Sequence, residues 1–135
     1  MTKLSRVHCI GIGGIGLSGL ADLLKDRGVE VSGSDAVPSE ITERLAKRGI
    51  LISTNAVGKI DADVQLVIRS AAVPDTHPEV VESEKLNIPV FIYPSALAQF
   101  AENYRERIVV SGTNGKSTTT AMIATIFDEA GADPT

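Results

Sequence analysis

The stretch RVHCIGIGGIGL, residues 6–17, decides the fold that this sequence predicts. It begins with a short apolar run, Arg6 to Ile12, which has the length and composition of a buried β-strand. Glycines cluster at the end of this run, and apolar residues then recur with helical spacing at Leu17, Leu20, Ala21 and Leu24. A strand, a glycine-rich turn and a helix in this order predict the first unit of a parallel α/β sheet.

The rest of the chain alternates between short apolar runs and helix-like segments. We expect further strands at residues 29–31, 50–53, 64–68, 88–92 and 107–111. Helices are expected near residues 39–49, 77–85, 95–104 and 116–130. The pattern predicts an α/β fold: a Rossmann-like, three-layer parallel sheet with helices on both faces. A further predicted strand, a loop and a predicted helix follow at residues 107–130.

The composition describes a globular domain and argues against several classes of protein. The 135 residues are 43% hydrophobic and 22% charged, which provides enough apolar material for one core. The formal net charge is −4 and no basic run stands out, so no nucleic-acid partner is expected. A single cysteine excludes an internal disulfide framework, and no apolar run reaches membrane-spanning length. The simplest expectation is a cytoplasmic protein without a membrane partner.

The first glycine cluster has the spacing Gly11-x-Gly13-x-x-Gly16 between a predicted strand and a predicted helix. Such a turn lets a phosphate approach backbone amides at a helix N-terminus, where unpaired N–H groups and the helix dipole favour an anion. Asp35 ends the next predicted strand, where a carboxylate can accept hydrogen bonds from a ribose or a base. The pattern therefore predicts dinucleotide-type anion binding. The alternative is that the glycines only let the helix pack closely on the sheet.

A second loop, SGTNGKST at residues 111–118, also lies between a predicted strand and a predicted helix. Gly115-Lys116-Ser117 matches the end of a Walker A motif, although Val110 stands where that motif has its first glycine. In such a loop the lysine reaches the β- and γ-phosphates of a nucleotide, and the following hydroxyl ligates Mg²⁺. We therefore predict a loop that binds a nucleoside triphosphate. The alternative is a capped helix start with an exposed lysine.

The two loops in this order resemble the Mur ligases, the ATP-dependent amide-forming enzymes of peptidoglycan synthesis. The resemblance is strongest with the N-terminal part of the alanine-adding branch and runs over essentially the whole chain. It is carried by residues 7–19 and 31–35, by Ser70-Ala71-Ala72-Val73, by Pro78-Glu79, by residues 88–90 and by residues 112–120.

The resemblance implies specific roles for both loops. In this family the first loop binds the UDP part of UDP-N-acetylmuramate, and the second holds ATP with Mg²⁺. Carried over, the UDP-sugar site comprises Gly11, Gly13, Gly14, Ile15, Gly16, Asp35 and Ser70. The ATP site comprises Gly112, Thr113, Asn114, Gly115, Lys116, Ser117 and Thr118, with Lys116 as the catalytic residue and Ser117 as the Mg²⁺ ligand.

The implied reaction transfers a phosphoryl group from ATP to a substrate carboxylate, and the amine of an amino acid then attacks the acyl phosphate. Such a ligase acts in cell wall biogenesis, and so in cell shape and cell division. The resemblance divides the chain into a UDP-sugar domain, residues 1–105, and the incomplete start of an ATP-binding domain, residues 106–135. This second part would be the first strand, phosphate-binding loop (P-loop) and helix of a truncated ATPase domain. On this interpretation the 135 residues alone are inactive, and the apolar faces of the last strand and helix favour self-association.

Several positions depart from the alanine-adding pattern. Asn114 and Ser117 stand where that branch usually has His and Thr, and Tyr93-Pro94-Ser95 replaces an Arg-Ala-Glu stretch. The added amino acid therefore stays open between L-alanine and the substrate of another Mur-type ligase, such as the murein tripeptide ligase. A non-catalytic Rossmann module that senses NAD or another nucleotide is the alternative from a different class.

Overall fold

The structure, a computed structural model, describes residues 4–54, 58–132 and 134. The chain divides into two compact units, Met1–Glu102 and Asn103–Thr135. Residues 1–3 and 55–57 of the predicted first domain, and residues 133 and 135 of the predicted second domain, lie outside the described residues.

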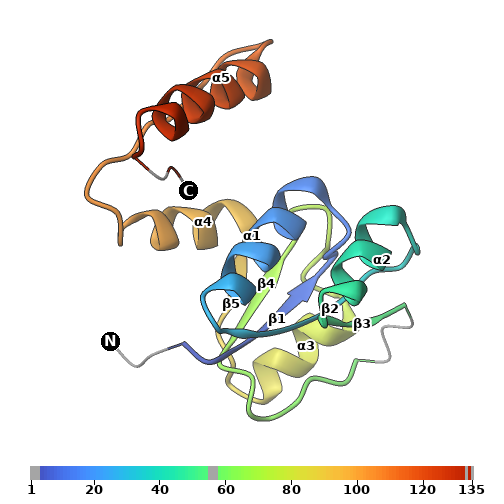
Figure 1. The fold of residues 1–135 in the computed structure, drawn as a ribbon. Coiled ribbons are helices and arrows are strands. Elements are labelled where there is room, and N and C mark those ends of the chain that lie inside the picture. The colour runs from blue at the N-terminus through green and yellow to red at the C-terminus, as the bar shows by residue number, and fades with distance from the viewer. Residues whose placement is uncertain (1–3, 55–57, 133, 135) are drawn as a thin grey trace. The chain divides into compact units, whose positions relative to one another are not determined.

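Five parallel strands form one sheet in the first unit, in the spatial order β3-β2-β1-β4-β5 (Figure 1). The register places Ile10 beside both Ser34 and Arg69, so β1, β2 and β4 end at the same level of the sheet. Each predicted strand of this unit is present, with shifted bounds. The strands are β1 (Arg6–Ile10), β2 (Glu30–Ser34), β3 (Leu51–Ser53), β4 (Leu66–Arg69) and β5 (Val90–Ile92).

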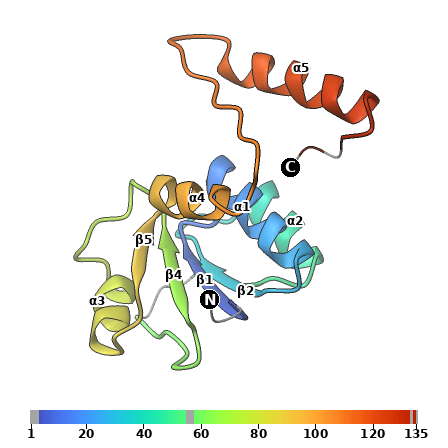
Figure 2. The same cartoon turned by 90° about the vertical axis from the view of Figure 1, so that its left-hand side faces the viewer.

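Helices cover both faces of this sheet, which confirms the predicted three-layer, Rossmann-like fold. Helices α1 (Ile15–Asp26), α2 (Glu40–Lys47) and α4 (Tyr93–Ala101) lie on one face and α3 (Pro78–Lys85) on the other (Figures 1 and 2). On the first face the buried side chains include Cys9, Leu20, Leu45 and Ala96. On the second face Ile10 and Val67 pack with Val80 of α3. Alternate residues of the central strands thus serve two cores, which explains their almost uninterrupted apolar character.

Sequence signals at the helix ends work as expected. Ser39 caps α2, accepting a hydrogen bond from the amide of Thr42. Gly28 and Gly49 follow α1 and α2 with φ of +78° and +80°, a conformation that favours glycine. None of the described helices is long and apolar enough to cross a membrane.

The second unit contains one described helix, α5 (Lys116–Glu129). The predicted strand at residues 107–111 is wrong, because these residues form no ladder and Val109 is 88% exposed. A strand needs a neighbour for its N–H and C=O groups, and no described part of this unit supplies one. No residue of α5 is buried, and the described residues of this unit form no core of their own.

Candidate functional site

The strand order reverses beside β1, which has β2 on one side and β4 on the other. In open α/β sheets the carboxyl ends of the two strands at such a reversal form the crevice where ligands bind. The loop of residues 11–14 follows β1, and Ser70 follows β4. The fold therefore brings the first predicted loop and Ser70 to the place where a ligand is expected.

The glycine loop is fixed to the end of β2. The amides of Gly11 and Ile12 donate to the carbonyl oxygen of Ser34 at 2.8 and 3.0 Å, and Gly11 has a φ of +78°. Helix α1 then starts at Ile15 with no acidic residue in its first turn. The first-turn amides of α1 have no acceptor inside the helix, so this end carries unpaired donors and partial positive charge suited to an anion.

Asp35 is part of the same arrangement. Its Oδ2 accepts a hydrogen bond from the amide of Gly13 at 2.8 Å, and its Oδ1 accepts one from the amide of Val37 at 3.1 Å. A β-carbon at Gly13 would lie 2.8 Å from Asp35 Oδ2 and 3.2 Å from a methyl carbon of Thr42. Glycine is thus required at position 13 for the loop to approach the carboxylate.

Ser70 lies directly beside the loop. Its amide donates to the carbonyl of Ile10 at 2.9 Å, and a β-carbon at Gly11 would lie 3.0 Å from Ser70 Cβ. Arg69 shapes the following loop by donating to the carbonyl of Val73 and to Asp75. The residues predicted for the UDP-sugar site therefore gather at one edge of the sheet: Gly11, Gly13, Gly14, Ile15, Gly16, Asp35 and Ser70.

Sequence reasoning assigned no role to Tyr93, which the structure places at this edge. A β-carbon at Gly16 would lie 2.8 Å from two ring carbons of Tyr93 and 3.0 Å from its hydroxyl oxygen. The ring therefore fills the space beside the first turn of α1. Its position directly after β5, at the carboxyl end of a parallel strand, is the signal that could have identified it.

We expect Gly16→Ala to be destabilising, although alanine in place of glycine inside a helix normally stabilises by about 0.5–1 kcal/mol. The added methyl group displaces the ring of Tyr93, at a cost of about 1–2 kcal/mol. Urea unfolding measures this change, with the double variant Gly16→Ala/Tyr93→Ala compared against Tyr93→Ala. In the absence of the ring the alanine should no longer destabilise, and an equal loss in both backgrounds would contradict the assignment.

The second loop lies at the start of α5. Gly115 caps the helix with a φ of +73°, and the Lys116 Nζ donates to the carbonyl oxygens of Gly112 and Thr113 at 2.7 and 3.3 Å. The lysine thus folds back over its own loop, where its charge can meet a phosphate bound at the helix N-terminus. The neighbouring Ser117 is exposed.

The exposed hydroxyl of Ser117 fits the hard-oxygen chemistry that Mg²⁺ prefers. Ser117 would supply a single ligand to the ion. The described residues contain no group of three or more His, Cys, Asp or Glu side chains that could hold a metal ion by themselves. The remaining ligands of a nucleotide-bound Mg²⁺ would be phosphate oxygens, water and residues of other segments.

A buried carboxylate lies beneath the glycine loop, on the α3 face of the sheet. Glu79 is 2% exposed, accepts a hydrogen bond from the hydroxyl of Ser34, and lies 3.5 Å from the Nε2 of His8. His77, which caps α3, faces it at 3.9 Å. Burial raises the pKa of Glu79, but the contacts with His8 and Ser34 outweigh it, so the pKa lies below its usual value.

This shift makes the stability of the first unit depend on pH. The ordinary pKa of a glutamate, 4.5, serves as the value in the unfolded state, and the folded-state pKa of Glu79 is lower. Ionised Glu79 therefore contributes fully to stability above the unfolded-state pKa. The contribution is lost as the pH falls through the folded-state pKa. We expect the difference in unfolding free energy between the wild type and Glu79→Gln to shrink between pH 5 and pH 3. Urea unfolding across this range measures it, and a constant difference would contradict an ionised Glu79.

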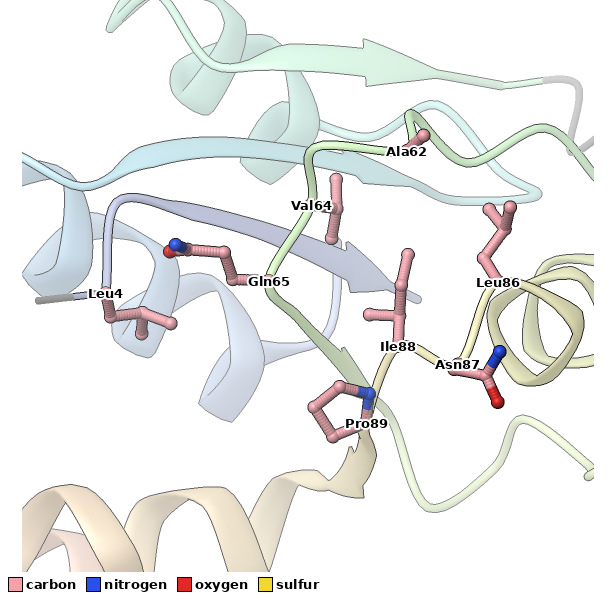
Figure 3. A pocket seen from close by; sticks show the side chains of 8 residues that line it. All are labelled: Leu4, Ala62, Val64, Gln65, Leu86, Asn87, Ile88 and Pro89. Atoms are coloured by element: carbon pink, nitrogen blue, oxygen red, sulfur yellow. The ribbon is translucent and has the colours of Figure 1, made fainter. Parts of the chain in front are cut away.

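The pocket in Figure 3 lies at the opposite edge of the sheet. It is formed by the segments that precede β1 and β4 and by the segment between α3 and β5. Its lining contains no residue of either loop and consists of Leu4, Ala62, Val64, Gln65, Leu86, Asn87, Ile88 and Pro89. Each loop, with its charged or amide donors, is therefore a candidate site of its own unit, and neither contributes to the lining of this pocket.

Comparison with known proteins gives consistent matches. The family model described as "Mur ligase family, catalytic domain" matches residues 6–105. The chain is 41% identical to UDP-N-acetylmuramate–L-alanine ligase of Baumannia cicadellinicola over 135 residues, which cover 100% of this chain and 27% of that ligase. It is 45% identical to the ligase of the same name from Pelobacter propionicus over 133 residues, covering 98% of this chain and 29% of that ligase.

Solved structures agree. UDP-N-acetylmuramate-alanine ligase from Thermotoga maritima superposes with a TM-score of 0.85 at 34% identity, covering 91% of this chain and 29% of that one. A murein peptide ligase from Psychrobacter arcticus gives a TM-score of 0.82 at 29% identity, covering 94% of this chain and 27% of that one. The chain spans less than a third of the length of these relatives, at 27–29%.

Proposed function

The chain belongs to the Mur ligase family, and from this premise we propose that it binds UDP-N-acetylmuramate as the N-terminal portion of an ATP-dependent ligase. The first unit would hold the UDP-sugar, and the second would contribute part of the ATP site. Joined to the rest of such an enzyme, these residues would serve the attachment of L-alanine in peptidoglycan synthesis.

The observation that carries the proposal is the convergence of the glycine loop, Asp35 and Ser70 at the strand-order reversal. The free amides at the start of α1 suit a diphosphate, because they offer several N–H donors in one direction. Asp35 stands at the end of β2, where Rossmann-type sites place the carboxylate that meets a ribose. We propose that Asp35 contacts the uridine part and Ser70 the sugar part of the substrate.

In the second unit we propose that residues 112–118 hold the phosphates of ATP and that Lys116 acts in catalysis. The chemistry transfers the γ-phosphoryl group to the carboxylate of the UDP-sugar, giving ADP and an acyl phosphate. The amine of the amino acid then attacks the acyl carbon, and inorganic phosphate leaves as the amide forms. Bound to the nucleotide, Mg²⁺ would neutralise phosphate charge. Lys116 would orient the γ-phosphate and stabilise the charge that it carries during transfer.

L-alanine is the amino acid favoured by the comparisons, because the two curated relatives reported above, at 41% and 45% identity, are ligases named for it. The family assignment argues against the alternative of a nucleotide-sensing module.

Titration calorimetry of the 135-residue chain tests the proposed substrate. We expect UDP-N-acetylmuramate to bind and NADH not to bind. UDP alone, as a matched ligand, should bind more weakly, because it lacks the sugar that would meet Ser70. Binding of NADH without binding of the UDP-sugar would overturn the proposal.

We further propose that the 135-residue chain, studied by itself, self-associates through α5. Met122 and Ile126 are 61% and 65% exposed on neighbouring turns of this helix, where a second copy could cover them. The sedimentation coefficient should therefore rise with protein concentration. Met122→Lys should abolish the rise, whereas Ala121→Lys adds the same charge on a different side of α5 and should leave it. A monomer at all concentrations would contradict this expectation.

A further inference from the structure

The buried cluster beneath the glycine loop has no part in ligand binding as described so far. It comprises Glu79 and Ser34, which are 2% and 1% exposed, and His8, whose Nε2 is buried without a hydrogen-bond partner and lies 3.5 Å from Glu79 Oε1. A buried carboxylate with polar partners is weak grounds for stability, because removing its charge from water costs about as much as those partners return. Apolar residues could fill this space between α3 and the sheet, so the carboxylate calls for another explanation.

Ser34 connects this cluster to the glycine loop. On one side, its hydroxyl donates to the Oε2 of Glu79. On the other side, its carbonyl oxygen accepts the amides of Gly11 and Ile12 at 2.8 and 3.0 Å. The next residue along the chain, Asp35, accepts the amide of Gly13 at 2.8 Å. Three successive amides of the loop are therefore held by two residues at the end of β2, and the first of these two is held by Glu79.

The direction of this network matters for an anion site. Amides bind phosphate well only when they are fixed in a common direction before the ligand arrives, since reorientation reduces affinity. Without an acceptor, the hydroxyl of Ser34 would be free to turn about the χ1 angle of the side chain. Glu79 removes this freedom from the opposite face of the sheet. The link between a hydroxyl and an ionised carboxylate is of the stronger, charge-assisted kind.

We propose that Glu79 is a positioning residue of the nucleotide site. From α3 it fixes Ser34, Ser34 holds the backbone of the glycine loop, and the loop in turn sets the direction of the free amides at the start of α1. The proposal rests on the proposed function in taking UDP-N-acetylmuramate as the ligand of this loop. It extends that function by including α3, whose Glu79 is linked to the glycine loop through Ser34 of β2, in the determinants of affinity.

The test is a double-mutant cycle on Glu79 and Ser34. The dissociation constant of UDP-N-acetylmuramate is measured for each variant. All measurements are made at a temperature at which circular dichroism shows every variant to be folded. Glu79→Ala and Ser34→Ala should each weaken binding about tenfold, and together they should weaken it little more than either alone. Glu79→Gln keeps an acceptor for the hydroxyl of Ser34 and should recover most of the affinity. Val80→Ala is the matched control, because it removes buried packing from the same helix without touching the polar link.

A purely structural role predicts a different pattern. In that case Val80→Ala and Glu79→Ala would change affinity equally, or neither would change it, and either result overturns the proposal. Amide hydrogen exchange of Gly11 and Ile12 in the absence of ligand gives an independent readout. Their protection should fall in Glu79→Ala and Ser34→Ala but not in Val80→Ala, and unchanged protection in the first two variants would also overturn it.

The two readouts separate this inference from the function on which it rests. If the wild type fails to bind UDP-N-acetylmuramate, the proposed function fails, and the exchange data still decide whether Glu79 holds the loop. If the wild type binds and Glu79→Ala binds equally well, the proposed function stands and the positioning role is refuted. If Glu79→Ala does not fold, Ser34→Ala and Glu79→Gln decide whether the positioning role exists. Neither of these variants removes side-chain volume from α3.

Discussion

Gly33→Ala is expected to destabilise the first unit by about 3 kcal/mol and to abolish binding of UDP-N-acetylmuramate. A β-carbon at Gly33 would lie 2.6 Å from the carbonyl oxygen of Cys9 and 2.7 Å from the Cδ1 of Ile12. The first of these atoms is backbone in the neighbouring strand, so no side-chain rotation can relieve the contact. The second belongs to the glycine loop, so strand and loop must both move.

Chemical denaturation and calorimetry measure the two effects of Gly33→Ala. The matched control is Gly19→Ala in α1, where a β-carbon would meet no atom within 4 Å. Because alanine favours a helix over glycine, that variant should gain about 0.5–1 kcal/mol of stability and bind the ligand unchanged. A Gly33→Ala protein with the stability and affinity of the wild type would contradict the close packing of β2 against the loop.

Lys116→Ala is expected to lower the ligation rate about a thousandfold in a full-length Mur ligase that carries this N-terminal segment. The Lys116 Nζ already lies over the loop, at 2.7 Å from the Gly112 carbonyl, in reach of a phosphate at the start of α5. Two charge-assisted hydrogen bonds to phosphate oxygens are worth about 1.5–3 kcal/mol each, which together correspond to a loss of this order.

The ligation rate can be followed by phosphate release in the presence of ATP, UDP-N-acetylmuramate and L-alanine. The affinity for UDP-N-acetylmuramate should not change, because its proposed site lies in the first unit. Lys85→Ala, which removes an exposed lysine paired with Glu82 on α3, is the control and should leave the rate unchanged. A Lys116→Ala enzyme with more than a tenth of the normal rate would refute the catalytic role of this lysine.

The elements of the first unit could be predicted because local signals and burial agree there. Leu17, Leu20 and Leu24 are all buried on one side of α1, and the helical spacing of these residues in the sequence reflects that single apolar face. The glycine loop could be located for the same reason, since the residue spacing and the strand before it are both local. The gathering of Asp35 and Ser70 around the loop followed from the parallel sheet, whose strands end at one edge.

The remaining features depend on contacts between distant parts of the chain. Glu79 is an ordinary polar helix residue in sequence, and only the packing of α3 against Ser34 and His8 reveals its burial. Tyr93 follows β5 and meets Gly16, which follows β1 on the other side of β4, and no spacing rule predicts this contact. The wrong strand at residues 107–111 shows the same limit, because an apolar run has strand propensity but forms a strand only where a partner offers its hydrogen bonds.

The most direct test of the central claim is an amide chemical-shift titration of the 135-residue chain with UDP-N-acetylmuramate. If the glycine loop binds the diphosphate, the largest shifts will occur at the amides of Gly13, Gly14, Ile15 and Gly16, with Ser70 also shifted. Residues at the opposite edge of the sheet, such as Gln65 and Asn87, should not respond. Saturable binding with shifts at that edge and none in the loop, or no shift at millimolar ligand, would contradict the account.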